Sequence, residues 1–132
     1  MSFKRINPES LGRPVGYTNG LLTTPDVRLL FIAGQIGWDE SQRLVSDDFV
    51  EQFDRALKNV LAVVLEAGGA AGGIARLVIY VTDKEEYRAR RREIGVRWRE
   101  QMGSNYPTMT LVEVKSLLED GAKVEIEGIA VL

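Results

Sequence analysis

The sequence predicts an α+β domain in which one mixed β-sheet carries two helices packed on one of its faces. Two segments, 47–67 and 83–102, repeat apolar residues at helical spacing, and short extended apolar segments precede, separate and follow them. The length of 132 residues suits one domain with a substantial core. We therefore expect residues 1–132 to form a single unit, because a sheet with helices on one side is a natural packing of such elements.

The N-terminal part is expected to lead into the first long strand. Residues 1–16 are polar and contain proline and glycine, which favours an irregular segment, and residues 17–23 are predicted to form a short strand. Residues 23–28 (TTPDVR) carry a turn signal, because proline fixes φ and aspartate bonds to the nearby backbone. Residues 29–37 (LLFIAGQIG) are predicted as a strand that is interrupted at Gly34.

The first helix is the clearest element of the sequence. Asp47 or Asp48 is expected to be its N-cap, and the glycines that follow Ala67 end it. Residues 68–73 (GGAAGG) then form a connector that is too short to separate two domains. The apolar stripe of this helix comprises Phe49, Phe53, Leu57 or Ala56, Val60 and Val64.

The second helix follows a strand at residues 75–82, which is apolar on both faces and is therefore expected to be covered on both sides. Thr82 or Asp83 is predicted to cap the helix, and Gly103 ends it. Its apolar stripe comprises Tyr87, Ile94, Trp98 and Met102.

Residues 108–117 and 122–132 are predicted as two final strands that form a hairpin through LEDG at 118–121. We expect Val112 and Val114 to lie with Val124 and Ile126 on the helix side. The opposite face of the sheet would then expose a large apolar surface, which is unusual for a monomer, so an oligomer is expected to cover it. The alternative is an ordinary sheet with one face in solvent. The helix-free face would carry Met109, Leu111, Glu113, Glu125, Glu127, Ile129 and Val131.

Composition excludes several kinds of chemistry. The chain has no cysteine and no histidine, so thiol catalysis, disulfides and the usual zinc ligands are absent. The net charge is −2, which gives no general attraction to nucleic acid or to anionic membranes. No signal peptide and no apolar segment of membrane-spanning length is apparent, so the expected location is the cytoplasm.

The ordered set of segments resembles the reactive intermediate deaminase A family, the RidA/YjgF-like proteins. No single segment decides the resemblance, but the order, the spacing and the total length of the segments match over nearly the whole chain. The segments are GYTNG (16–20), LLFIAGQIG (29–37), FDRALKNVLAVVLEAG (53–68), LVIYVTD (77–83), YPTMTLVEV (106–114) and KVEIEGIAVL (123–132).

The resemblance implies a chorismate-mutase-like fold and a homotrimer, with small-molecule sites in clefts between subunits. The activity implied is hydrolysis of reactive enamines and imines to a carbonyl compound and ammonia. It implies neither a metal nor an organic cofactor, which agrees with a chain that lacks histidine and cysteine.

Four positions match the family's site residues. By resemblance, Tyr17 walls the cleft, and Ala33 and Gly34 occupy the pair after the second strand, where glycine permits close approach of a ligand. Glu125 matches the carboxylate that orients or activates the attacking water, a role open to a carboxylate of suitable geometry and pKa.

Met109 departs from the family pattern, which has an arginine at this position to clamp the substrate carboxylate. Methionine offers a soft apolar surface instead, so we expect an altered substrate. A second departure is Arg91, which stands where the family often has asparagine; Arg90, Arg91 or Arg92 would supply a replacement cation unless these arginines form only a solvated helix face.

Two functions remain open at this point. The first is an enamine or imine hydrolase with an altered substrate, and the second is a trimer that binds a small metabolite without turning it over. A role in RNA cleavage is less expected, because the chain has no histidine and no strip of aromatic and basic residues that would stack on bases.

Overall fold

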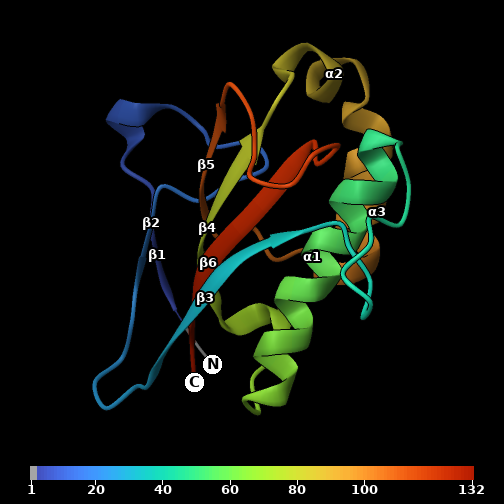
Figure 1. The fold of residues 1–132 in the computed structure, drawn as a ribbon. Coiled ribbons are helices and arrows are strands. Elements are labelled where there is room, and N and C mark those ends of the chain that lie inside the picture. Colours follow the sequence, from blue (N-terminus) through green and yellow to red (C-terminus); the bar gives the residue numbers. More distant parts are fainter. Residues whose placement is uncertain (1–2) are drawn as a thin grey trace.

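The computed structural model describes residues 3–132, which fold into a helical layer and a β-sheet (Figure 1). The elements in chain order are β1 (Lys4–Ile6), the 3₁₀ turn η1 (Glu9–Leu11), β2 (Gly20–Leu22), β3 (Leu29–Ile36), α1 (Phe49–Glu66), η2 (Ala71–Gly73), β4 (Ile74–Val81), α2 (Lys84–Ala89), α3 (Arg91–Met102), β5 (Thr108–Glu113) and β6 (Val124–Val131).

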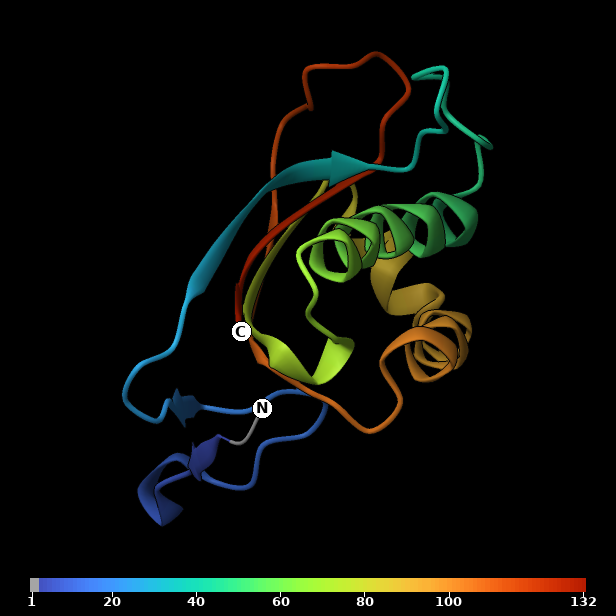
Figure 2. The ribbon, with the colours of Figure 1, turned by 90° about the horizontal axis from the view of Figure 1, so that it is seen from below.

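The main sheet has the strand order β3-β6-β4-β5, and α1 and α3 cover one of its faces (Figure 2). The predicted α+β class, with helices on one face of a mixed sheet, is confirmed. β4 and β5 are parallel because the helical segment between them returns the chain to the same end of the sheet, whereas β6 runs antiparallel to both of its neighbours.

The predicted hairpin between the last two strands is wrong. β6 pairs with β3 and β4 and has no pairing with β5, so the LEDG turn lies in a longer connection that crosses β4. The physical reason is burial: Val124, Ile126 and Ala130 are completely buried, and the centre of the sheet covers them better than an edge would. Burial therefore overrides the local turn signal.

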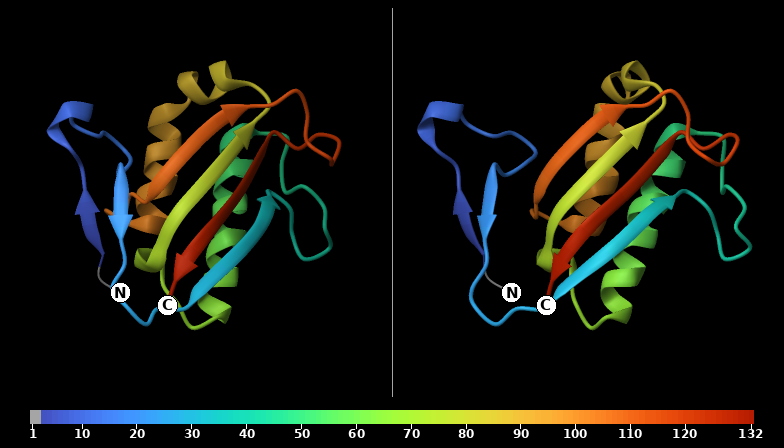
Figure 3. Two further views of the ribbon diagram at one scale, coloured as in Figure 1. Left: turned by 90° about the vertical axis from the view of Figure 1, so that its left-hand side faces the viewer. Right: turned by 60° about the vertical axis from the view of Figure 1, so that its left-hand side comes forward.

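The prediction for the N-terminal segment is also wrong in part. Residues 3–16 were expected to be irregular, but β1 lies within them and forms a separate two-stranded sheet with β2. The strand predicted at 17–23 is shorter in the structure, because β2 covers only residues 20–22. Figure 3 shows this small sheet beyond the β5 edge of the main sheet. Thr18 anchors it there: its N–H donates to the Pro107 carbonyl at 3.2 Å and its hydroxyl to the Tyr106 carbonyl at 2.6 Å.

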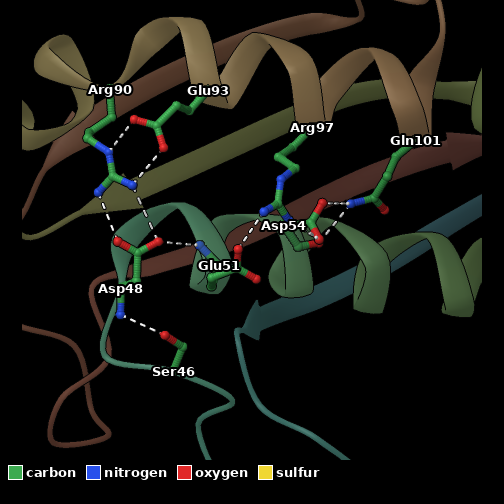
Figure 4. Close-up of polar contacts among 8 residues, drawn as sticks. All are labelled: Ser46, Asp48, Glu51, Asp54, Arg90, Glu93, Arg97 and Gln101. Carbon is green, nitrogen blue, oxygen red and sulfur yellow. Dashed lines mark hydrogen bonds and ion pairs between the residues drawn. The ribbon is translucent and has the colours of Figure 1, made fainter.

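The first helix agrees with the prediction and shows that Asp48, not Asp47, is its N-cap, because the Asp48 carboxylate accepts from the Glu51 N–H at 3.1 Å. The predicted second helix is divided into α2 and α3 at Arg90, whose φ of −110° and ψ of 19° are not helical. The Arg90 guanidinium binds Asp48 at 2.9 Å and Glu93 at 2.7 Å, which ties this break to the start of α1 (Figure 4).

Candidate functional site

The helix-free face carries a bulge of β3 that lies against Glu125 of β6. The pairing of β3 with β6 shifts between Ile32 and Gln35, so Ala33 and Gly34 occupy the irregular part of the strand. A Cβ atom on Gly34 would lie 2.8 Å from Cδ of Glu125 and 2.9 Å from its Oε1. The missing side chain of Gly34 therefore allows the Glu125 carboxylate to lie directly against the backbone of β3.

The two glutamates on this face differ in their partners. The Tyr80 hydroxyl donates to Oε1 of Glu127 at 2.5 Å, and this hydrogen bond raises the pKa of Tyr80 because the neutral phenol is the donor. Within residues 3–132, no side chain or backbone N–H forms a hydrogen bond or ion pair with the Glu125 carboxylate. Glu125, which is half-buried, is therefore the carboxylate available to an external ligand or water.

Met109 and Arg91 line a different hollow, between α3 and the helix-facing side of β4 and β5. Its volume is about 220 Å³. The sequence-predicted Met109 and Arg91 are thus brought together, and the segment before Tyr17 reaches the same hollow through Gly16. Tyr17 itself is 40% exposed. The lining comprises Val15, Gly16, Phe53, Ile79, Tyr87, Arg91, Ile94, Gly95, Trp98, Tyr106 and Met109.

Met109 and Glu125 lie on opposite faces of the sheet, contrary to the prediction that they share the helix-free face. Met109 is paired in register with Leu77, which is completely buried against the helices, and Met109 packs against the same core. Glu125 is paired with Tyr80, whose side chain points to the other side. The predicted placement of Leu111 and Glu113 was wrong for the same reason, since they pair in register with the buried Ile79 and Val81. Val112, expected on the helix side, is 38% exposed.

A single chain therefore carries five of the six predicted site residues in two groups, and Tyr17 belongs to neither. Ala33, Gly34 and Glu125 form one group on the helix-free face, and Met109 and Arg91 belong to the hollow on the helix side. These groups cannot enclose one small ligand within one chain, because the sheet lies between them.

Among the residues that line the hollow, the sequence identified only Arg91 and Met109 as site residues, and it did not indicate such a role for Gly95, Trp98 or Tyr106. The rings of Trp98 and Tyr106 stack with centroids 6.0 Å apart, and the indole N–H donates to the Asn105 carbonyl at 3.1 Å. Gly95 was the available signal, because glycine inside a helix costs about 1 kcal/mol relative to alanine and calls for a reason. In the structure a Cβ at this position would meet only Nη1 of Arg99, at 3.5 Å, so packing does not require the glycine, and its missing side chain leaves this part of the lining open.

Comparison with known proteins places the chain in a family. The family model described as Endoribonuclease L-PSP matches residues 15–132. TdcF of Escherichia coli, a protein named as a reactive intermediate deaminase, is 32% identical over 103 residues, which cover 78% of each chain. The chain belongs to the RidA/YjgF-like family.

Two solved structures of RidA-like proteins extend this assignment to the fold. The Rid family protein YyfB of Yersinia pestis superimposes with a TM-score of 0.87 at 27% identity, and the match covers 100% of both chains. The structure of E. coli TdcF with bound serine gives a TM-score of 0.70 at 29% identity and covers 92% of this chain and 91% of TdcF. The fold is therefore the chorismate-mutase-like fold of the RidA/YjgF proteins.

Among residues 3–132, no three side chains of aspartate, glutamate, histidine or cysteine gather closely enough to hold a metal ion. None of the helices in the same range combines the length and the apolar character needed to cross a membrane.

Proposed function

We propose that this protein hydrolyses enamines or imines to a carbonyl compound and ammonia, in sites formed between copies of the chain in a homotrimer. The observation that carries the proposal is the Glu125 carboxylate, which is partly exposed, without an internal partner, and seated against the glycine of a strand bulge. Such a carboxylate can orient a water molecule and accept its proton.

The helix-free face supports the need for further copies. Phe31 is 71% exposed, Leu29 is 55% exposed, and Val112 is 38% exposed, all on strands of the main sheet. A hollow of about 410 Å³ beside Phe31 is lined by apolar side chains, including Val78 and Ile129, and by the charged side chains of Arg76 and Glu127. Exposed apolar surface rimmed by polar residues typically marks an interface, and the family resemblance implies that two more copies cover it.

An assembly of this kind would also bring the two groups of site residues together across the contact between two chains. Glu125 of one chain would face the Met109 hollow of its neighbour, so that each site takes its carboxylate from one copy and its apolar wall from another. The three copies would then provide three equivalent sites, as cyclic symmetry requires.

The proposed reaction needs no group beyond the chain and water. Glu125 accepts a proton from water as the water oxygen bonds to the imine carbon, and it passes this proton to the imine nitrogen to give a carbinolamine. Glu125 then takes the hydroxyl proton and delivers it to the amine nitrogen as the C–N bond breaks, so that ammonia leaves and the carbonyl compound remains. Backbone N–H groups beside Gly34 are the proposed donors that polarise the substrate.

Met109 separates this chain from a typical deaminase of the family. A methionine cannot make the bidentate contact by which arginine holds a carboxylate, so a small 2-imino acid would lose its clamp beside the reacting carbon. We therefore propose an altered substrate that offers an apolar surface to Met109. The same observation favours the second candidate, a trimer that binds a small apolar metabolite without turnover.

The test uses imines generated from a range of amino acids in the presence of semicarbazide, which traps them as semicarbazones. Active protein lowers the amount trapped because it removes the imine first. We expect Glu125→Gln to reduce this activity about 100-fold or more, the usual scale for loss of a general base. The matched control is Glu127→Gln, which keeps an acceptor oxygen for Tyr80 and should retain activity.

Two outcomes contradict the enzyme. If wild-type protein leaves the amount of semicarbazone unchanged for charged and uncharged imines alike, the trimer that binds a metabolite without turnover is the better account. If Glu125→Gln and Glu127→Gln behave identically, then turnover does not depend on the free carboxylate.

A further inference from the structure

Arg91 has no carboxylate partner, in contrast to Arg90 and Arg97 of the same helical segment. Arg90 is held by Asp48 and Glu93, and Arg97 is held by Asp54 at 3.0 Å and by Glu51. No acidic side chain within residues 3–132 forms an ion pair with Arg91, which is exposed at the start of α3. Arg91 is therefore a free cation, and it lies on the lining of the Met109 hollow.

The rest of that hollow is apolar and aromatic. Met109, Trp98 and Tyr87 line it with polarisable side chains, and Gly95 leaves space on the α3 side. An apolar cavity of about 150 Å³ is enough to hold benzene. The volume of about 220 Å³ therefore admits an aromatic ring together with a short chain.

We propose that this hollow binds small amphiphilic carboxylates, with the apolar or aromatic body against Met109 and Trp98 and the carboxylate on Arg91 at the mouth. The cation that binds the carboxylate would be Arg91 on α3, whereas the family pattern places an arginine at position 109 on the strand. The preferred ligand is therefore longer than a 2-imino acid of three or four carbons. This inference rests on the proposed function, because it names the substrate class for the apolar half of that site.

A solvated arginine face would look similar without binding anything, and Arg92 provides the comparison. Arg92 is the next residue on α3, is also exposed and has no ion pair within residues 3–132, but it does not line the hollow. Arg91→Gln and Arg92→Gln therefore remove the same charge from the same helix turn, and only the first removes it from the mouth of the hollow.

The experiment is titration calorimetry of the whole protein with 3-phenylpropanoate, its uncharged analogue 3-phenylpropanamide, and propanoate. We expect 3-phenylpropanoate to bind roughly three- to tenfold more tightly than the amide, the scale of one partly exposed charge pair. Propanoate should bind at least tenfold more weakly, because it lacks the ring that fills the hollow. Arg91→Gln should remove the difference between acid and amide, and Arg92→Gln should preserve it.

A second variant tests the hollow itself. Gly95→Leu should fill it and abolish binding of both aromatic probes, while circular dichroism shows a melting temperature no lower than that of the wild type, because leucine favours the helix more than glycine does. The inference is overturned if acid and amide bind equally to the wild type, if Arg92→Gln matches Arg91→Gln, or if folded Gly95→Leu still binds the ring.

These results separate the inference from the proposed function. Binding that depends on Arg91 and Gly95, without turnover of the corresponding imines, supports the proposed binding site and contradicts the proposed hydrolase activity. Turnover that depends on Glu125 but not on Arg91, Gly95 or the aromatic body removes the inference and leaves the enzyme.

Discussion

The two faces of the main sheet differ in how completely a single chain buries their apolar side chains and provides partners for their charged groups. On the helix side, Leu77 and Ile126 are completely buried under α1 and α3. On the other side, Phe31 is 71% exposed and the Glu125 carboxylate has no partner among the described residues. Packing on the helix side, the finished face, therefore stabilises the chain. The helix-free side, the unfinished face, is left partly uncovered by a single chain and carries Glu125, the carboxylate best placed for chemistry.

Shortening a side chain on the finished face should have the largest effect on stability. Ile126→Ala removes three methyl or methylene groups at a site with 0% exposure and should lower the free energy of unfolding by about 2–5 kcal/mol in urea denaturation. Phe31→Ala is the control on the opposite face, and it should instead weaken association. Equal losses of unfolding free energy in the isolated chains would remove the distinction between the faces.

Gly34→Ala tests the unfinished face by moving the carboxylate instead of deleting it. The new Cβ would lie 2.8 Å from Cδ of Glu125, which is the mobile end of a side chain, so the carboxylate should shift while the fold persists. We expect turnover to fall about tenfold, because catalytic groups lose activity when displaced by fractions of an ångström. The control is Gly37→Ala, whose Cβ would lie 2.6 Å from Cα of Gln52 and should therefore destabilise the fold. Unchanged turnover in Gly34→Ala would show that the position of this carboxylate is unimportant.

The ion pairs between α1 and α3 should contribute little, although they are prominent on the helix side (Figure 4). Arg97→Met keeps the apolar stem and removes the contacts to Glu51 and Asp54, whose side chains are 46% and 25% exposed. We expect a loss of about 0.5–1 kcal/mol at low salt that shrinks at 1 M salt. Arg92→Met should cause no loss, and a larger salt-independent loss in Arg97→Met would mean that this network determines the helix packing.

The smallest expected effect is the pH dependence that comes from Asp48. The hydrogen bond from Arg90 lowers the pKa of Asp48 below its ordinary value of 3.8, and the N-cap contact from Glu51 acts in the same direction. A lowered folded-state pKa means that the stabilisation is present above pH 3.8 and is lost as the pH falls through the folded pKa. Asp48→Asn keeps a capping residue but cannot titrate.

The difference in unfolding free energy between wild type and Asp48→Asn should therefore be constant near neutral pH and should shrink below about pH 4. A difference that stays constant down to about pH 2 would show that the charge of Asp48 contributes nothing beyond the cap.

The elements that depend on local periodicity could be predicted from the sequence, and the sheet order could not. The first helix is marked by its N-cap and by five apolar positions at helical spacing, all of which are buried. The place of β6 between β3 and β4 depends on contacts between segments far apart in the chain, and no local signal encodes it. The turn chemistry of residues 118–121 indicated a hairpin that burial of β6 prevents.

The same limit applies to the candidate site. Strand alternation correctly places Glu125 and Glu127 on one face, and the glycine at position 34 does lie against Glu125. Alternation cannot relate one strand to another, so the assumed hairpin register put Met109 on the wrong face. Parallel pairing with Leu77 fixes the true face. The separation of Met109 from Glu125 then became visible only in three dimensions.

Light scattering of the wild-type protein across the concentrations used for turnover tests most directly whether copies of the chain complete the unfinished face. We predict a mass three times that of the 14.7 kDa chain, and a mass near that of one chain for Phe31→Asp, which places a charge in the proposed interface. A wild-type mass of one chain throughout that range would contradict the account.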